Sequence, residues 1–394
     1  MARRLRTAGG MRARTLAGVA LIATLALVGG ACGDDGDDDA KDTTTPTDQS
    51  ATTAATGGND EAATELAALL ERPTEITNTT PFEGEIPADK TITWIQCPVP
   101  ACVALGEPLE DAAEALGWTL KIVDHDGTPE SLKAAYAQVV REKPDGVISS
   151  GYPRVMFEEE LAELKAANIP VIQVTVTDSP GDGLTAVINS GVRNAEAGRQ
   201  LALYTGVKSE GKANVLWVTT DFPIVVPTLE GQDGKGGFQP TLEGMCDCPV
   251  EVLNVPQEAI GVDSPARIVS ALQANTDINY VVSPLGDLFI GLPGALADAG
   301  LAERVKLVTH DQNPTLSAEL EDGTIDAVVG FPGYEEMFQA MDTMLRFFAG
   351  EDFTAAADDF PSWIITKGKV PSTTDNYPLV EDYQEQYKAL WGVD

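Results

Sequence analysis

The chain has 394 residues, which is long enough for two domains that each bury a hydrophobic core. Its 61 acidic residues outnumber its 26 basic residues, and the formal net charge is −35. Such a charge repels nucleic acids and anionic lipid surfaces, so we expect neither as a direct partner. The acidic surface itself indicates solubility and identifies no ligand.

Residues 1–31 are expected to form a signal peptide. The first 14 residues contain five arginines and no acidic residue, and an apolar run from Leu16 to Val28 follows them. A run of about 13 residues is too short for a bilayer span, which needs about 20. The same length, behind a basic start, is typical of a signal-peptide core.

Residues 32–85 are expected to form an anchored acidic linker. Small residues precede Cys32, and this arrangement resembles the lipobox of bacterial lipoproteins, in which the cysteine becomes the lipidated first residue. The resemblance implies lipidation of Cys32 and a place on the outer face of the cell membrane. Gly29 stands where that family prefers Leu, so cleavage without lipidation remains an alternative. The residues that follow are rich in Asp and poor in large apolar side chains, which predicts disorder.

Four further cysteines lie in what would be an oxidising compartment, where disulfides form. Cys97 and Cys102 flank a short loop with two prolines, and Cys246 and Cys248 are separated by one residue. Three pairings can form, and the two local ones are favoured. The Cys97–Cys102 bridge would hold its loop rigid.

From residue 90 onward, β-branched apolar runs alternate with amphipathic segments. The expected strands are 91–96, 118–125, 145–151, 169–176, 184–191, 212–220, 250–255, 278–284, 305–311, 325–331 and 362–367. The expected helices are 103–117, 128–144, 157–168, 196–207, 236–246, 263–275, 291–300, 316–323, 334–350 and 379–392. This alternation predicts an α/β fold with parallel sheets covered by helices on both faces. So many strands favour two domains over one open sheet.

The segments LEDAAEALGWTLKIVD, EKPDGVISSGYP, LKAANIPVIQV and VKLVTHDQNP occur in this order along the chain. Together they resemble type I periplasmic binding proteins of the ribose/galactose-binding family, which serve ABC importers. The resemblance runs from Ile92 to Lys367. It implies two Rossmann-like lobes joined by a three-segment hinge, with a solute held in the cleft between them.

The resemblance also implies how the chain is divided between the lobes. The N-terminal lobe would contain residues 90–190 plus 333–360, and the C-terminal lobe residues 191–332 plus 361–394. The three crossings would fall near 189–194, 330–333 and 360–363.

Ligands of such sheets bind beyond the carboxyl ends of the strands. The residues expected there to contact the solute are Gln96, Val99, Ser150, Tyr152, Thr175, Asp221, Phe222, Asp311 and Phe331.

Asp311 matches the carboxylate with which the family binds ligand hydroxyls, although it could instead cap the helix that follows. Tyr152 and Phe331 could equally be packing residues, and Asp221 could be a turn residue. Where sugar binders carry an Asp-Arg pair, this chain has Thr175-Val176. The resemblance therefore implies a sugar-like or less polar solute.

Enzymatic chemistry is not expected. The chain has no Gly-x-Ser-x-Gly motif, and GQDGKGGF lacks the Ser or Thr of a phosphate loop. The cysteine spacing and two distant histidines predict no metal site, and we expect no cofactor. The expected function is that of a monomeric, lipid-anchored solute-binding protein that delivers its ligand to an ABC permease. A sensor that signals to a membrane kinase is the alternative, since it would use the same lobes.

Overall fold

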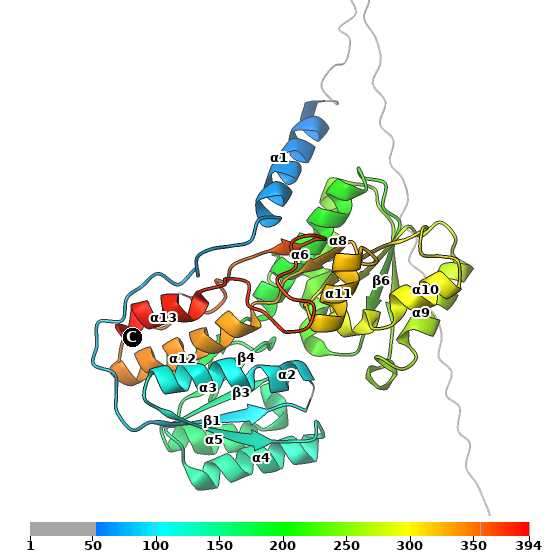
Figure 1. The fold of residues 1–394 in the computed structure, drawn as a ribbon. Coiled ribbons are helices and arrows are strands. Elements are labelled where there is room, and N and C mark those ends of the chain that lie inside the picture. The colour runs from blue at the N-terminus through cyan, green and yellow to red at the C-terminus, as the bar shows by residue number, and fades with distance from the viewer. Residues whose placement is uncertain (1–52, 99, 355, 394) are drawn as a thin grey trace, which may run out of the picture. The chain divides into compact units, whose positions relative to one another are not determined.

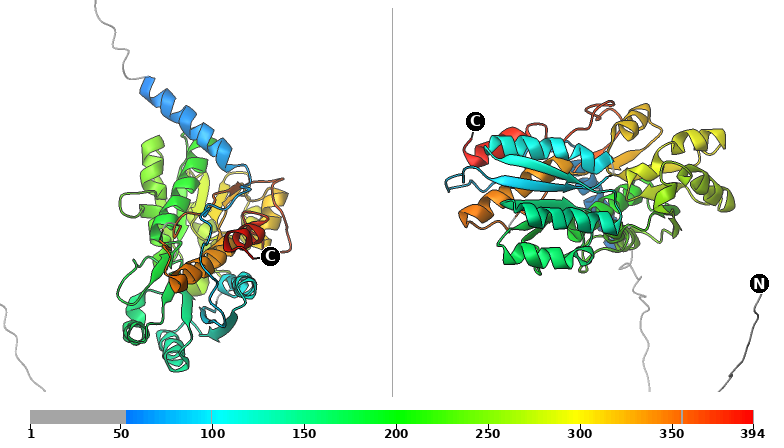
Figure 2. Two further views of the ribbon diagram at one scale, coloured as in Figure 1. Left: turned by 90° about the vertical axis from the view of Figure 1, so that its left-hand side faces the viewer. Right: turned by 90° about the horizontal axis from the view of Figure 1, so that it is seen from below.

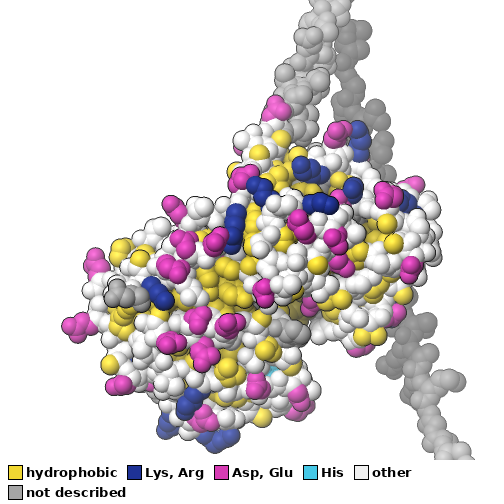
Figure 3. Space-filling view, in the orientation of Figure 1, with side chains coloured by type: hydrophobic (Ala, Val, Ile, Leu, Met, Phe, Trp, Pro, Cys, Tyr) yellow, Lys and Arg dark blue, Asp and Glu magenta, His cyan; other side chains and the backbone are white. Residues whose placement is uncertain are grey.

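The computed structural model describes residues 53–98, 100–354 and 356–393. These residues form two sheets with helices on both faces (Figure 1). The predicted α/β class with two parallel-sheet lobes is confirmed. None of the helices in the described ranges combines the length and the apolar character that a bilayer span requires. On the face shown in Figure 3, acidic side chains are spread over the surface rather than gathered in one patch.

The first lobe is built on a parallel sheet with the strand order β2-β1-β3-β4-β5. Its strands are β1 Thr91–Gln96, β2 Thr119–Asp124, β3 Gly146–Ser150, β4 Val171–Val174 and β5 Ala186–Ile188. Alternate residues of a strand point to opposite faces of its sheet. Ile92 and Trp94 therefore face one core and Ile95 faces the other.

Helices cover both faces of this sheet. They are α2 Pro100–Ala104, α3 Gly106–Ala115, α4 Pro129–Glu142, α5 Glu158–Ala166 and α12 Gly333–Ala349. Helices α3 and α12 pack on the face of Ile92, and α4 and α5 pack on the opposite face. Helix α4 is capped at its first turn, since the Thr128 hydroxyl accepts a hydrogen bond from the Ser131 amide at 3.2 Å. The single helix predicted over 103–117 is instead divided into α2 and α3.

The second lobe has the strand order β11-β10-β9-β8-β6-β7, in which only β11 is antiparallel to its neighbour. Its strands are β6 Val215–Thr219, β7 Val250–Asn254, β8 Tyr280–Ser283, β9 Lys306–His310, β10 Ala327–Val329 and β11 Ile364–Ile365. Its helices are α6 Gly191–Lys208, α7 Val226–Glu230, α8 Phe238–Met245, α9 Ser264–Ala274, α10 Leu292–Asp298 and α11 Pro314–Asp322. Helices α6 and α8 cover one face, and α9, α10 and α11 cover the other.

The chain passes between the sheets at 189–190, 330–332 and 350–363, close to the predicted crossings. Two of these segments are hydrogen-bonded to each other. The Asp358 carboxylate accepts hydrogen bonds from the Ser190 amide at 2.6 Å and the Ser190 hydroxyl at 2.8 Å. The Asn189 amide donates to the Ala357 carbonyl at 3.0 Å.

The linker predicted over 32–85 is wrong from residue 53 onward, while residues before 53 and Cys32 lie outside the described residues. Helix α1 (Thr53–Leu69) packs against α6 of the second lobe, and its Leu66 is buried. This helix was not predicted because the sequence before it is acidic and rich in Thr. Its contact with α6 is made by a stripe of apolar side chains, formed by Ala62, Leu66, Leu69 and Leu70.

The C-terminal helix α13 (Tyr383–Trp391) also departs from the prediction, which placed 361–394 in the second lobe. Its Trp391 ring stacks on Phe338 of α12, with centroids 5.6 Å apart and an interplanar angle of 3°. Tyr383 and Tyr387 join the same core. The views in Figure 2 show α12 and α13 side by side. Helix α13 thus packs on the first lobe, whereas β11 belongs to the second sheet.

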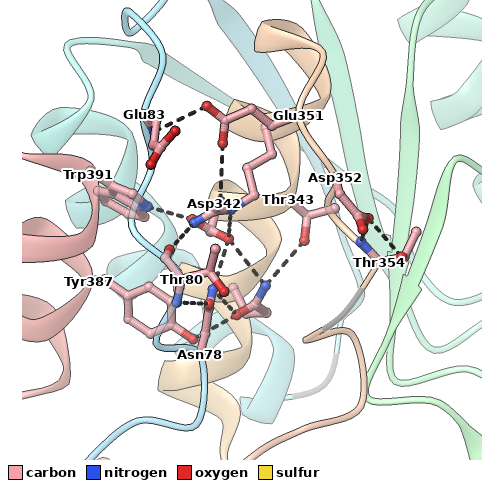
Figure 4. Close-up of polar contacts among 12 residues, drawn as sticks. Asn78, Thr80, Glu83, Asp342, Thr343, Glu351, Asp352, Thr354, Tyr387 and Trp391 are labelled. Carbon is pink, nitrogen blue, oxygen red and sulfur yellow. Dashed lines mark hydrogen bonds and ion pairs between the residues drawn. The ribbon is translucent and has the colours of Figure 1, made fainter.

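A buried polar cluster joins α12, α13 and the segment that follows α1 (Figure 4). At its centre, the Asp342 carboxylate pairs with Arg346 at 2.8 Å, and both side chains are at most 5% exposed. The same carboxylate accepts hydrogen bonds from Asn78 at 3.0 Å and from the Trp391 indole at 2.9 Å. The N-terminal segment and the C-terminal helix are therefore held on α12 by one carboxylate.

Candidate ligand-binding site

A cavity of about 340 Å³ opens where residues of the two lobes meet. The first lobe contributes Ala101 and Ala104 of α2 and the adjoining Leu105. The second lobe contributes side chains at the carboxyl ends of its strands, including Asp311 after β9 and Phe331 after β10. This is the position in which ligands of open α/β sheets bind. A smaller cavity of about 170 Å³ lies near Lys306 and Asp326, at the amino ends of strands, and is remote from that edge.

Asp311 presents its carboxylate to the cavity from an unusual backbone conformation. Its φ angle is +75°, in the left-handed region that residues other than glycine seldom adopt. Its amide donates to the Val329 carbonyl at 3.0 Å, which fixes the turn. The cap of α11 is Asn313, whose side-chain oxygen accepts from the Leu316 amide at 3.0 Å. The alternative role of Asp311 as a helix cap is therefore wrong.

A second carboxylate, Asp287 in the short helix Gly286–Phe289, lines the same cavity. It accepts a hydrogen bond from the Asn313 amide group at 3.3 Å. Burial raises the pKa of Asp287, and burial together with the negative charge of Asp287 raises the pKa of Asp311 to about 7. The two carboxyl groups thus share an environment that opposes their ionisation.

A third carboxyl group, Glu336 in the first turn of α12, lies close enough to Asp311 for the charge of Asp311 to raise its pKa. Burial is the larger cause, and the pKa of Glu336 rises to about 8. One of its oxygens accepts a hydrogen bond from the Thr175 hydroxyl at 2.6 Å. Thr175 is thus committed to Glu336 within the first lobe and does not line the cavity.

The aromatic wall of the cavity is held in place by Gln312. Its side chain donates to the Phe331 carbonyl at 3.1 Å and accepts from the Phe331 amide at 2.7 Å. The side-chain amide of Gln312 also donates to the Tyr377 carbonyl at 3.4 Å. Because Phe331 and Tyr377 both line the cavity, Gln312 acts as a positioning residue for them.

A profile of the periplasmic binding protein domain matches residues 86–352, about two-thirds of the chain. The chain belongs to the periplasmic binding protein family. This family is solute-binding rather than catalytic.

Solved structures with the same fold agree with this membership. GanP, a glucose-galactose binding protein from Geobacillus stearothermophilus, superposes with a TM-score of 0.61 at 19% identity, over 72% of this chain and 99% of that one. A periplasmic ribose ABC transporter protein from Conexibacter woesei gives a TM-score of 0.61 at 19% identity, over 73% and 95%. A chain of the XylFII-LytSN complex gives 0.61 at 16% identity, over 72% and 100%. No curated protein matches the sequence.

Of the residues predicted to contact the solute, the cavity of this periplasmic binding protein contains Asp311 and Phe331. Gln96 instead donates to Asp124 at 2.9 Å, at the end of the neighbouring strand. Asp221 is exposed and accepts from Asn254 at 2.6 Å. Val99 lies outside the described residues.

Ser150, Tyr152 and Phe222 lie at the same edge of the sheets but beyond the cavity. A Cβ atom on Gly151 would lie 3.7 Å from Cζ of Phe222, so the loops after β3 and β6 approach each other there. Tyr152 makes an edge-to-face contact with His125, with ring centroids 5.1 Å apart. The buried Ser150 hydroxyl lies 3.4 Å from the sulfur of Cys102.

The disulfide Cys97–Cys102 links the end of β1 to α2, and the Cα atoms of its cysteines are 5.6 Å apart. The second predicted pairing, Cys246–Cys248, is also present, with a Cα separation of 5.2 Å. Because Cys102 lies between cavity residues Ala101 and Ala104, the first disulfide restrains one wall of the cavity.

Several residues of this cavity were not among those predicted from the sequence: Leu105, Asp287, Ile290, Tyr334, Asn376 and Tyr377. Asp287 follows a strand, which is the signal that could have identified it. Asn376 and Tyr377 lie in a segment without regular structure, so no strand end points to them. No group of three or more potential metal ligands occurs within the described ranges.

Proposed function

We propose that this periplasmic binding protein captures a small hydroxylated solute in the cavity between its lobes and delivers it, unchanged, to an ABC permease. The observation that carries the proposal is the 340 Å³ cavity at the carboxyl ends of the strands. Its carboxylates can accept hydrogen bonds from hydroxyl groups, and its aromatic rings can cover the faces of a ring-shaped solute. The sugar-binding proteins of the same fold support a sugar-like ligand.

The lobes move in this proposal by hinge bending at 189–190, 330–332 and 350–363. The chain also passes between the lobes from α1 to β1 and from β11 to α13, so these two segments must bend as well. A solute that contacts α2 on one side and Asp311 on the other favours the closed arrangement, because only that arrangement makes both sets of contacts. The N-terminal residues would keep the chain at the outer face of the membrane through a lipid on Cys32. The binding unit itself would act as a monomer.

Isothermal titration of the chain against sugars, polyols, amino sugars and aromatic acids tests the proposal. Asp311→Ala should weaken the binding of the tightest solute at least 100-fold. It should leave the melting temperature of the free protein within a few degrees of the wild type. Asp298→Asn, a change on the exposed surface of α10, is the matched control and should bind normally. Unchanged affinity in Asp311→Ala would show that the solute binds elsewhere, and chemical conversion of the recovered solute would show an enzyme.

A sensor is the second candidate, because a structure of the same fold is a complex, XylFII-LytSN. A gene deletion separates the two functions. Transport predicts loss of uptake of the labelled solute, whereas sensing predicts normal uptake with a lost transcriptional response.

A further inference from the structure

The charged side chains that line the cavity are all acidic. Asp287 and Asp311 both line it, and none of the described residues that line it is Lys, Arg or His. Glu336 does not line the cavity, but its carboxyl group is close enough for the charge of Asp311 to add to the effect of burial on its pKa. Among the described residues, the wall of the cavity therefore carries acidic side chains and no basic one.

The carboxylate of Asp311 accepts no hydrogen bond from the described residues; the only hydrogen bond of this residue there is the one its amide donates to Val329. The carboxylate of Asp287 accepts a single hydrogen bond from the described residues, donated by the Asn313 side chain at 3.3 Å. One oxygen of Glu336 is buried without a partner. Carboxylates that are partly removed from water need donors or opposite charges, and the described residues give the Asp311 carboxylate no hydrogen bond and the Asp287 carboxylate one.

The nearest basic groups do not supply the missing charge. His310 precedes Asp311, but burial lowers its pKa to about 4, so the imidazole is neutral at pH 7. Arg193 is buried, and its Nη2 donates to the Pro361 carbonyl at 3.2 Å and the Ser362 hydroxyl at 3.4 Å, while its Nε and Nη1 have no partner among the described residues. Neither residue lines the cavity. Burial and Asp287 are the only causes of the raised pKa of Asp311, and no cation opposes them.

The remaining walls suit an ammonium group as well as they suit a sugar ring. Phe331, Tyr334 and Tyr377 line the cavity, and the faces of aromatic rings attract cations. An ammonium group carries three hydrogen-bond donors and no acceptor, which matches a site that offers mainly acceptors.

We propose that the solute of this cavity carries a positively charged amino group next to its hydroxyl groups, as an amino sugar does. The inference rests on the proposed function and specifies the chemical class of the ligand. The amino group lies between Asp311 and Asp287, where it neutralises the pair, and the aromatic residues cover the rest of the molecule. An acidic sugar is rejected because it would add a further negative charge.

Calorimetry at pH 7 with ligands that differ in charge tests this inference. Glucosamine and galactosamine are compared with glucose and galactose, with their N-acetylated forms and with glucuronate and galacturonate. We expect an amino sugar to bind at least tenfold more tightly than its neutral parent, and the acidic sugars to bind most weakly. A neutral or acidic sugar that binds as tightly as its amino counterpart would overturn the inference and leave the proposed function intact.

The variant Asp311→Asn keeps the shape of the side chain and removes its charge. It should weaken the binding of the amino sugar at least tenfold while changing the affinity for the neutral parent less than threefold. Asp287→Asn should change the two affinities in the same direction. Asp298→Asn should alter neither affinity. Equal losses for charged and neutral ligands would show a merely structural role for Asp311 and refute the charge pairing. A panel in which no sugar of any charge binds would count against the proposed function as well.

Discussion

Asp311 combines a left-handed backbone, a half-buried carboxyl group and a neighbouring Asp287, each of which has a cost in free energy. A carboxyl group whose pKa is raised in the folded state favours folding only while it is protonated. The unfolded chain ionises from its ordinary pKa of about 3.8 upward, and the folded chain only from about 7. Stability is therefore lost as pH rises through this interval.

The free protein should accordingly lose about 2–3 kcal/mol of stability between pH 5 and pH 8 through Asp311, since about two pH units separate pH 5 from its folded pKa of about 7 and one unit corresponds to about 1.4 kcal/mol. Urea unfolding at pH 5 and at pH 8 measures this loss of stability. His310 acts in the opposite direction, because its lowered pKa makes the unfolded chain bind the extra proton. The informative quantity is the difference between the wild type and Asp311→Asn. Identical pH dependence in the two proteins would contradict a raised pKa at Asp311.

At this scale the sequence identified Asp311 and Phe331 because each follows a strand, and strand ends converge at one edge of a sheet. The same rule also selected Gln96 and Thr175, which lie at strand ends but are hydrogen-bonded to Asp124 and Glu336. Position in the chain shows where a strand ends, and it does not show what a side chain bonds to once neighbouring strands are in place.

Helix α12 carries Asp342, the buried carboxylate that binds both the segment after α1 and the C-terminal helix. Asp342→Ala should reduce the free energy of unfolding by about 3–5 kcal/mol, because it leaves Arg346 charged, buried and without its closest charged partner. Urea denaturation measures the loss. Glu210→Ala removes an ion pair whose side chains are 76% and 81% exposed, and it should change stability little. A loss at Asp342 as small as that at Glu210 would show that the cluster contributes no stability.

The regular elements of the lobes were predictable because their β-branched runs and amphipathic segments have distinct periods. Helix α13 was predicted as well, but its location was wrong. Periodicity identifies the apolar face of a helix, whereas the lobe that covers this face depends on the path of residues 366–382, which have no regular structure. Helix α1 was missed because its apolar stripe is short and follows an acidic, Thr-rich segment.

For the molecule as a whole, the order of strands and helices predicted two α/β domains, since a parallel sheet requires helical connections of a recognisable length. The three crossings between them came from the resemblance to periplasmic binding proteins. The cavity could not be predicted in the same way. It combines α2, the strand ends of the second lobe, the start of α12 and residues 376–377, which come together only when both lobes are folded.

The measurement that tests the central claim most directly is a crystal structure of the chain with its tightest solute from the calorimetric panel. We predict intact solute in the cavity, with Asp311 and Phe331 on one side of it and α2 on the other. Solute bound outside this cavity, for example beside Lys306 and Asp326, or density for a converted product, would contradict the account.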